Sequence, residues 1–174
     1  MKTKIKTLIH TALVAEAKPL IGYFHLKCIA KIPFNIYKND DIALIVSGIG
    51  GEKTEAAILY ALSLYEPKTA INIGCAGCAD TSVKIGSLFC TTHADLPLPY
   101  ASLSSHEHPV SSSEGLNSLL ADQEGEAFLR TVPSSVEKYI FKVVSDHLNP
   151  TLFSKETLSS LMQKSLPLWS VYAK

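Results

Sequence analysis

The sequence predicts an α/β protein in which an open sheet is covered by helices. Two observations support this: near-continuous apolar runs, which are typical of buried strands, alternate along the chain with segments of helical periodicity, and glycine-rich turns follow two of the runs, at Ser47–Gly51 and Gly74–Gly77. The chain of 174 residues is 47% hydrophobic and 18% charged, a balance that fits one globular domain with a sizeable core. We therefore expect residues 1–174 to form a single domain.

The first half of the chain predicts strands and helices in alternation. Pro19 is tolerated in the first turn of a short helix, and the four turn residues after Ser47 should lead into a second helix. The expected strands are Ile5–Val14, a hairpin of Lys27–Ile32 and Asn35–Lys38, Ile42–Ser47 and Thr69–Ile73, and the expected helices are Glu16–His25 and Glu52–Tyr65.

The second half is less regular. Small residues predict a loop at Gly74–Asp80, and prolines and serines mark an irregular stretch from Pro97 to Ser113. The remaining expected strands are Ser87–Thr92 and Tyr139–Val144, and the expected helices are Leu116–Ala121, Glu124–Arg130 and Lys155–Lys164.

Charge and cysteine content limit the class of function and the compartment. The formal net charge is zero and no basic face is present, which argues against nucleic-acid binding; no apolar run is long enough for a membrane span. Lys2, Lys4 and Lys6 before an apolar stretch imitate a signal peptide, but the stretch reads equally well as a first buried strand. Because the four cysteines lie in or beside apolar segments, we expect a cytoplasmic protein.

Unusual residues follow four of the predicted strands. In open α/β sheets, ligands gather at the carboxyl ends of strands. Each glycine-rich turn could cradle an anion on its backbone N–H groups or be only a tight turn. The four strand ends are Ala15-Glu16-Ala17, Ser47-Gly48-Ile49-Gly50, Gly74-Cys75-Ala76-Gly77 and Val144-Ser145-Asp146.

One ordered series of segments around these strand ends resembles the nucleoside phosphorylase/nucleosidase superfamily. The segments are Ala12–Leu20, Ser47–Gly50, Asn72–Gly77, Gln123–Ala127 and Val144–Asp146. The likeness is to methylthioadenosine/adenosylhomocysteine nucleosidases, futalosine nucleosidases and short phosphorylase-like proteins of hopanoid biosynthesis. It runs in pieces from about Leu8 to Leu148. It implies a three-layer fold with a central mixed sheet, no cofactor, no metal, a homodimer and a purine nucleoside as the partner molecule.

The resemblance implies that the chain cleaves the N-glycosidic bond of an adenine-type nucleoside. Cleavage leaves negative charge on the base and positive charge on the sugar. Asp146, oriented by Ser145, would protonate or hydrogen-bond the purine if burial kept its proton in place. Glu126 would bind the ribose hydroxyls, and Glu16 would activate the attacking water.

The resemblance also implies further substrate contacts, and it is incomplete. The segment between Thr92 and Ser104 is short, and Lys142 and Gly125 stand where nucleosidases often carry arginine and methionine. The further contacts implied are Gly50, Cys75, Ala76, Gly77, Gly125, Lys142, His106 and His108.

Several alternatives stay open. Asp146 could cap a helix, Glu126 could interact with a helix dipole, and Glu16 could be solvated surface. Arg130 is the only arginine, which favours hydrolysis over phosphorolysis because phosphate recognition favours the guanidinium group. An inactive nucleoside-binding relative is a further alternative, and so is a zinc protein that uses Cys75, Cys78, Cys90 and His93.

Overall fold

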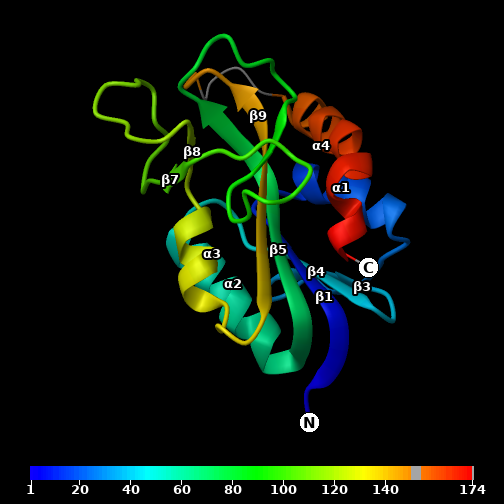
Figure 1. Ribbon diagram of the computed structural model, residues 1–174. Coiled ribbons are helices and arrows are strands. Elements are labelled where there is room, and N and C mark those ends of the chain that lie inside the picture. Colours follow the sequence, from blue (N-terminus) through cyan, green and yellow to red (C-terminus); the bar gives the residue numbers. More distant parts are fainter. Residues whose placement is uncertain (150–153, 174) are drawn as a thin grey trace.

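The computed structural model describes residues 1–149 and 154–173. Figure 1 shows strands and helices that alternate along most of the chain. The strands are β1 (Thr3–Thr11), β2 (Lys27–Ala30), β3 (Asn35–Lys38), β4 (Ile42–Val46), β5 (Tyr65–Cys78), β6 (Leu88–Cys90), β7 (Leu103–Ser105), β8 (Leu120–Asp122) and β9 (Glu137–Asp146). The helices are α1 (Val14–Tyr23), α2 (Gly51–Leu64), α3 (Gly125–Thr131), α4 (Lys155–Trp169) and the 3-10 turn η1 (Ser170–Ala173).

One mixed sheet forms the centre of the described chain. Its strands follow the order β2-β3-β4-β1-β5-β8-β7, with β9 paired to β5 and β6. The four long inner strands β4, β1, β5 and β9 are parallel to one another. Their carboxyl ends therefore meet at one edge of the sheet, where ligand sites form in such folds.

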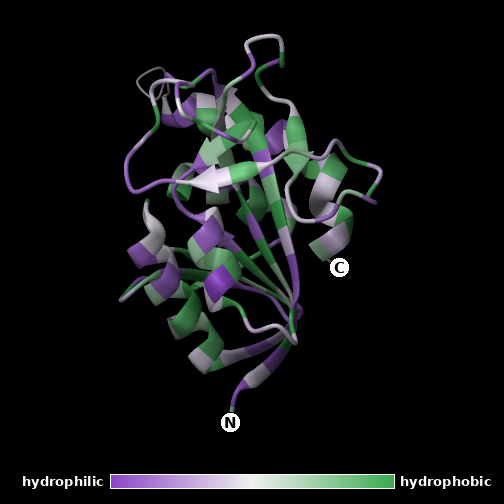
Figure 2. Ribbon diagram, turned by 60° about the vertical axis from the view of Figure 1, so that its left-hand side comes forward, coloured by the Kyte–Doolittle hydropathy of each residue, from purple (hydrophilic) through white to green (hydrophobic). Residues whose placement is uncertain are grey.

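Helices cover both faces of the sheet. Figure 1 shows α1 and α4 on one side of β1 and β5, and α2 and α3 on the other. The α1/α4 side buries Leu20, Phe141 and Trp169, whereas the α2/α3 side buries Ile58 and Phe128. Figure 2 shows hydrophobic and hydrophilic residues alternating in bands along these helices, as expected of helices with one buried face. The predicted α/β fold with a central mixed sheet is confirmed.

Two sequence predictions about secondary structure are wrong. The segment predicted as a loop at Gly74–Asp80 continues β5 as far as Cys78, because β5 pairs with β9 through Gly77 and with β8 through Cys78. The helix predicted at Leu116–Ala121 is absent, and residues 120–122 instead form β8 between β7 and β5. In both places pairing with strands distant in sequence outweighs local preference.

No helix in the described part of the chain is both long and apolar enough to cross a membrane.

Candidate active site

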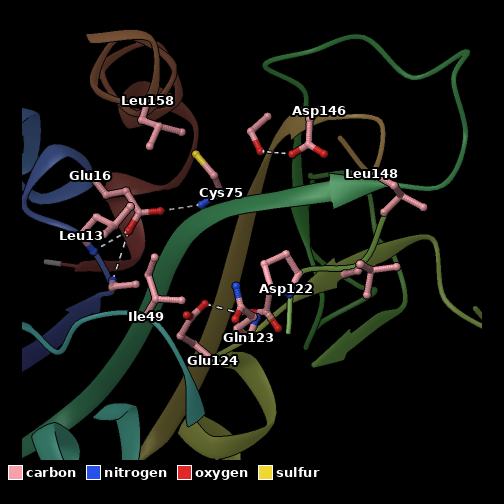
Figure 3. Close-up of a pocket in the computed structure, with 15 residues that line it drawn as sticks. Leu13, Glu16, Ile49, Cys75, Asp122, Gln123, Glu124, Asp146, Leu148 and Leu158 are labelled. Atoms are coloured by element: carbon pink, nitrogen blue, oxygen red, sulfur yellow. Dashed lines mark hydrogen bonds between the residues drawn. The ribbon is translucent and has the colours of Figure 1, made fainter. Parts of the chain in front are cut away.

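A cavity of about 160 Å³ lies at the edge of the sheet where the parallel strands end. Figure 3 shows side chains from α1, β5, β8 and β9 converging on it. Four of the lining residues are acidic, and none of the described lining residues is lysine or arginine. The lining residues are Ala12, Leu13, Glu16, Ile49, Cys75, Pro109, Val110, Ala121, Asp122, Gln123, Glu124, Ser145, Asp146, Leu148 and Leu158.

Glu16 is buried at the start of α1 and is held by backbone N–H groups. Its Oε2 accepts hydrogen bonds from the N–H groups of Ala12 at 3.2 Å and Leu13 at 3.0 Å, and its Oε1 accepts one from Cys75 at 2.9 Å. A side chain at Gly74 would bring a Cβ within 3.0 Å of Oε1, so glycine leaves the room that the carboxylate occupies. Burial raises the pKa of Glu16 despite the Cys75 and Leu13 N–H groups, which favour ionisation. Glu16 is thus a fixed carboxylate rather than solvated surface.

Asp146 is buried at the end of β9 on the opposite side of the cavity. Its Oδ2 accepts a hydrogen bond from the Ser145 hydroxyl at 2.7 Å, and its Oδ1 accepts one from the Asn149 N–H at 2.7 Å. A Cβ at Gly77 would lie 3.3 Å from Oδ1 and 3.0 Å from the Leu148 side chain, which explains glycine at this position. The Ser145 hydroxyl also lies 3.3 Å from the Ala76 carbonyl oxygen.

Glu124, directly before α3, supplies a further buried carboxylate to the cavity. Its Oε1 accepts a hydrogen bond from the Gly50 N–H at 2.9 Å, and Gly50 has a φ of +107°, which favours glycine. Burial raises the pKa of Glu124, whereas the Lys142 ammonium opposes the rise.

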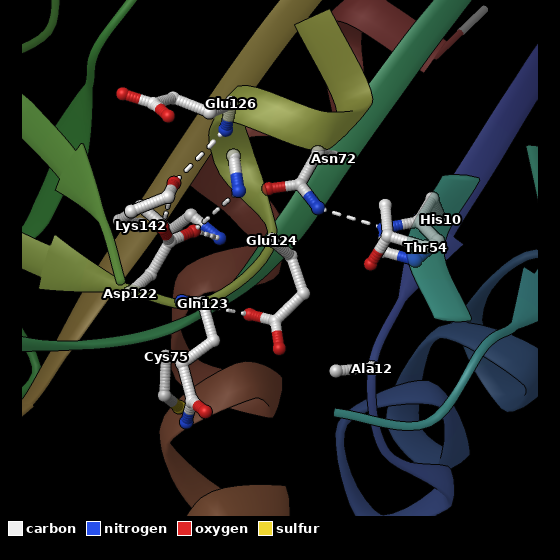
Figure 4. Close-up of polar contacts among 12 residues, drawn as sticks. His10, Ala12, Thr54, Asn72, Cys75, Asp122, Gln123, Glu124, Glu126 and Lys142 are labelled. Carbon is white, nitrogen blue, oxygen red and sulfur yellow. Dashed lines mark hydrogen bonds and ion pairs between the residues drawn. The ribbon is translucent and has the colours of Figure 1, made fainter. Parts of the chain in front are cut away.

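The structure brings Glu124, rather than Glu126, to this cavity. Glu126 is exposed on α3, and its backbone N–H binds the Ser105 hydroxyl at 2.9 Å. Figure 4 shows the carboxylates of Glu124 and Glu126 on different sides of the chain. The acidic pair around Gly125 was visible in the sequence, but the member that faces inward was not.

Asp122, which also lines the cavity, forms a buried ion pair with Lys142. Lys142 Nζ lies 2.7 Å from Asp122 Oδ2, and each side chain is 1% exposed. Burial lowers the pKa of Lys142, but the Asp122 and Glu124 carboxylates outweigh burial and raise it overall. The ammonium is therefore charged and engaged with Asp122, and Lys142 does not line the cavity.

Gly125 does not line the cavity; it lies close to neighbouring side chains instead. Its N–H binds Asp122 Oδ2 at 2.9 Å. A Cβ there would approach the end of the Leu103 side chain to 2.7 Å and Asp122 Oδ2 to 3.1 Å, so a larger residue would force these side chains to shift.

His106 and His108 lie outside the cavity, in an open groove of about 610 Å³ beside it. The groove also contains Lys53, Arg130 and Glu126, and Gly50 lines its floor. Ile49 and Gln123 line both spaces and so separate them. In place of the histidines, Pro109 and Val110 line the cavity; sequence reasoning missed them because they lie in the irregular stretch.

The cysteines do not form a metal site in the described residues. Cys75 lines the cavity, and burial together with nearby Glu16 raises the pKa of its thiol well above the ordinary range. His93 is engaged with Glu137 at 3.1 Å. No group of three or more metal-binding side chains occurs in residues 1–149 and 154–173, so Cys75, Cys78, Cys90 and His93 are not gathered as the zinc alternative requires.

Comparisons with known proteins agree with this architecture. A 5'-methylthioadenosine/S-adenosylhomocysteine nucleosidase from Buchnera aphidicola (strain APS) is 40% identical over 58 residues, which are 33% of this chain and only 25% of that relative. Futalosine hydrolase of Helicobacter pylori superposes with a TM-score of 0.77 at 15% identity, covering 97% of both chains. A 5'-methylthioadenosine/S-adenosylhomocysteine nucleosidase from S. pneumoniae, solved with the inhibitor MT-ImmA, gives a TM-score of 0.79 at 13% identity, covering 98% of this chain and 99% of that one.

The family itself is established by sequence. The model of the phosphorylase superfamily matches residues 10–133, which include the strand ends at Glu16, Ser47 and Cys75 and the Glu124 segment. Since the match covers well over half of the 174 residues, this chain belongs to the phosphorylase superfamily.

Proposed function

We propose that this protein hydrolyses the N-glycosidic bond of an adenine-type purine nucleoside to the free base and the free sugar. The observation that carries the proposal is the gathering of Glu16, Glu124 and Asp146 around one small cavity that apolar side chains also line. Glycosidic cleavage needs groups that meet opposite charges on base and sugar. A protonated carboxyl group can stabilise the negative charge on the base, and an ionised carboxylate can stabilise the positive charge on the sugar.

Asp146 is the candidate acid for the departing base. It ends β9 and lines the cavity together with the apolar residues Leu148 and Val110, which suit the faces of a purine ring. The Ser145 and Asn149 hydrogen bonds fix the plane of its carboxyl group. A carboxylic acid held in this way can protonate or hydrogen-bond a ring nitrogen as negative charge develops there.

Glu16 is the candidate base for the attacking water. Backbone N–H groups on both of its oxygens fix its position, and its raised pKa makes it a better proton acceptor than an exposed glutamate. Glu124 is the candidate ligand for the sugar hydroxyls, since its Oε1 is fixed by Gly50 and its carboxylate favours a cationic sugar.

The charges around the cavity favour water over phosphate as the acceptor. A phosphate dianion would meet the carboxylates of Glu16 and Glu124 with no lysine or arginine among the described lining residues. Arg130 lies in the groove and is engaged with Glu55 at 3.0 Å, and Lys142 is engaged with Asp122.

The relatives suggest which nucleosides to assay. Nucleosidases named for methylthioadenosine and adenosylhomocysteine, and a futalosine hydrolase, share the fold. A 5'-methylthioadenosine/S-adenosylhomocysteine nucleosidase mutant from Helicobacter pylori was solved with 5'-methylthioadenosine in its active site. Leu13 and Ile49 supply apolar surface on the cavity wall that an alkylthio substituent could contact.

A product assay tests the proposal. Methylthioadenosine, adenosylhomocysteine, futalosine, adenosine and inosine are each incubated with the protein in phosphate-free buffer, and base and sugar are measured by chromatography. We expect release of base and free sugar from at least one adenine nucleoside, at a rate that added phosphate does not change. A requirement for phosphate with formation of a sugar 1-phosphate would make the chain a phosphorylase. No base from any of the five would support an inactive nucleoside-binding relative.

A further inference from the structure

A buried histidine outside the cavity makes side-chain contacts that connect β1, β5 and the residue after β4, and these strands lead to the cavity. His10 on β1 is fully buried. Its Nδ1 lies 2.7 Å from Asn72 Nδ2 on β5, and its Nε2 lies 2.8 Å from the hydroxyl of Ser47, which follows β4. Its ring stacks on Phe128 at a centroid distance of 6.1 Å. Figure 4 shows the contact between His10 and Asn72.

The hydrogen bonds have only one consistent direction. Ser47 Oγ lies 2.6 Å from the Gly48 carbonyl oxygen, which can only accept, so the Ser47 hydrogen points to Gly48. His10 Nε2 must then carry a hydrogen and donate to Ser47 Oγ. In the neutral ring Nδ1 is left as an acceptor, and the Asn72 amide nitrogen donates to it. The order of donation is Asn72 to His10 to Ser47 to Gly48.

Asn72 is consistent with this direction. Its Oδ1 is buried without a hydrogen-bond partner in the described chain. Within the described residues, the Asn72 side-chain oxygen thus makes no hydrogen bond, whereas its nitrogen donates one to His10.

This series of hydrogen bonds ends on the turn that holds Glu124. Gly48 and Gly50 have φ values of +90° and +107°. The Gly48 N–H binds the Ala12 carbonyl oxygen at 2.9 Å, and the Gly50 N–H binds Glu124. The carbonyl oxygen of Gly50 accepts a hydrogen bond from the Thr54 N–H at 3.0 Å, in the first turn of α2. The turn is thus held from β1, from α2 and, through Ser47, from His10.

We propose that His10 is a positioning residue: through Ser47 it fixes the Ser47–Gly50 turn, and the turn places the Glu124 carboxylate for recognition of the sugar hydroxyls. The consequence for the sugar rests on the proposed nucleosidase function. The consequence for the turn does not rest on that function, since it follows from the hydrogen bonds alone.

The hydrogen bonds of this series do not depend on pH near neutrality. Burial, assisted by the Lys142 ammonium and opposed by the Asp122 carboxylate, lowers the pKa of His10 to about 3. Asn72, Ser47 and Phe128, the residues in direct contact, are uncharged at neutral pH. His10 therefore stays neutral, and its effect on the turn does not change with pH near neutrality.

The test compares Ser47→Ala with Ser63→Ala. Ser47→Ala removes the link to Gly48 and deletes a single atom, whereas Ser63→Ala removes an exposed hydroxyl at the far end of α2 that binds the Tyr60 carbonyl. We expect the Gly50 amide to exchange hydrogen about tenfold faster in Ser47→Ala, and unchanged in Ser63→Ala, as loss of one hydrogen bond near the turn implies. Unchanged Gly50 exchange in Ser47→Ala would overturn the proposal even if the protein has no enzyme activity.

A second measurement addresses the sugar. With a riboside and the matching 2′-deoxyriboside, Ser47→Ala should lower kcat/KM about tenfold for the riboside and clearly less for the deoxyriboside. A purely structural loss would lower both equally and overturn the proposed effect on sugar recognition.

A third measurement tests His10 itself. His10→Gln can keep an N–H donor toward Ser47, so it should retain more riboside selectivity than His10→Leu, which keeps only apolar bulk. The nitrogen-15 shifts of His10 should report the neutral ring with the hydrogen on Nε2 from pH 5 to 9. The other ring tautomer, or a protonated ring in that range, would contradict the direction of donation.

Discussion

The cavity and the neighbouring groove differ in how exposed their charged side chains are. In the cavity, Glu16, Glu124 and Asp146 are buried, and backbone N–H groups bind each of them. In the groove, Lys53, Arg130 and Glu126 lie on open surface, and the Arg130 and Glu55 side chains are 65% and 46% exposed. Ile49 and Gln123 are all that the two linings share.

The difference shows why chemistry belongs in the cavity. Exposed charges are screened by water and salt, so each contributes little to a transition state. Carboxylates fixed in a water-poor site interact strongly with developing charge and need no rearrangement during reaction.

Asp146→Asn should abolish most turnover. The amide can still accept the Asn149 N–H bond, so the fold should persist, but it cannot deliver a proton to the leaving base. General acid catalysis contributes about 10²–10⁴-fold, and we expect a loss of kcat in that range on an adenine nucleoside. Asp40→Asn, at an exposed aspartate, is the matched control and should leave kcat unchanged. Activity near that of the wild type in Asp146→Asn would mean that Asp146 only caps the chain after β9.

The pH profile should show an acid limb from Glu16. Glu16 acts as a base only when ionised, and burial raises its pKa above the ordinary glutamate value of 4.5. As pH is lowered, the rate should therefore begin to fall while the pH is still above 4.5, and it should drop by about tenfold per pH unit below the raised pKa. A raised carboxyl pKa means that the folded protein binds the proton more tightly than the unfolded chain does. The contribution of Glu16 and Glu124 to the free energy of unfolding therefore falls as pH rises, and their protonation in mild acid should not unfold the protein.

Two measurements isolate this limb. Thermal melting at each pH separates loss of activity from unfolding. In Glu124→Gln the limb should persist and move to lower pH, because the Glu124 charge is one cause of the raised pKa of Glu16. A rate that is flat down to pH 4.5 would exclude Glu16 as the base.

Sequence reasoning succeeded where a residue is tied to a strand end. Glu16 follows β1 and Asp146 ends β9, and parallel strands bring such positions to one edge of the sheet whatever the details of the loops. Cys75 also lines the cavity, but it lies within β5; the sequence prediction ended that strand several residues too early.

The same reasoning failed where placement depends on distant contacts. The short strand β8 exists only because β5 and β7 pair with it. Pro109 and Val110 reach the cavity through an irregular loop with no periodicity to predict its path. The choice between Glu124 and Glu126 depends on where α3 begins: Glu124 lies directly before the helix, whereas Glu126 lies in its first turn.

The smallest and most discriminating prediction compares these two glutamates. Glu124→Gln should weaken kcat/KM for adenosine by the value of a charge-assisted hydrogen bond, about 1.5–3 kcal/mol, and should weaken it less for 2′-deoxyadenosine, which lacks one hydroxyl for the carboxylate to engage. Glu126→Gln makes the same change two residues away on exposed surface, where loss of a solvated charge should alter neither value by more than about twofold. If Glu126→Gln instead gave the larger, riboside-selective loss, the sugar would bind in the groove, and the cavity would not be the site of the reaction. Equal losses on both substrates in Glu124→Gln would leave the cavity as the site but remove 2′-hydroxyl recognition from Glu124, because only a contact that the deoxyriboside cannot make produces a selective loss.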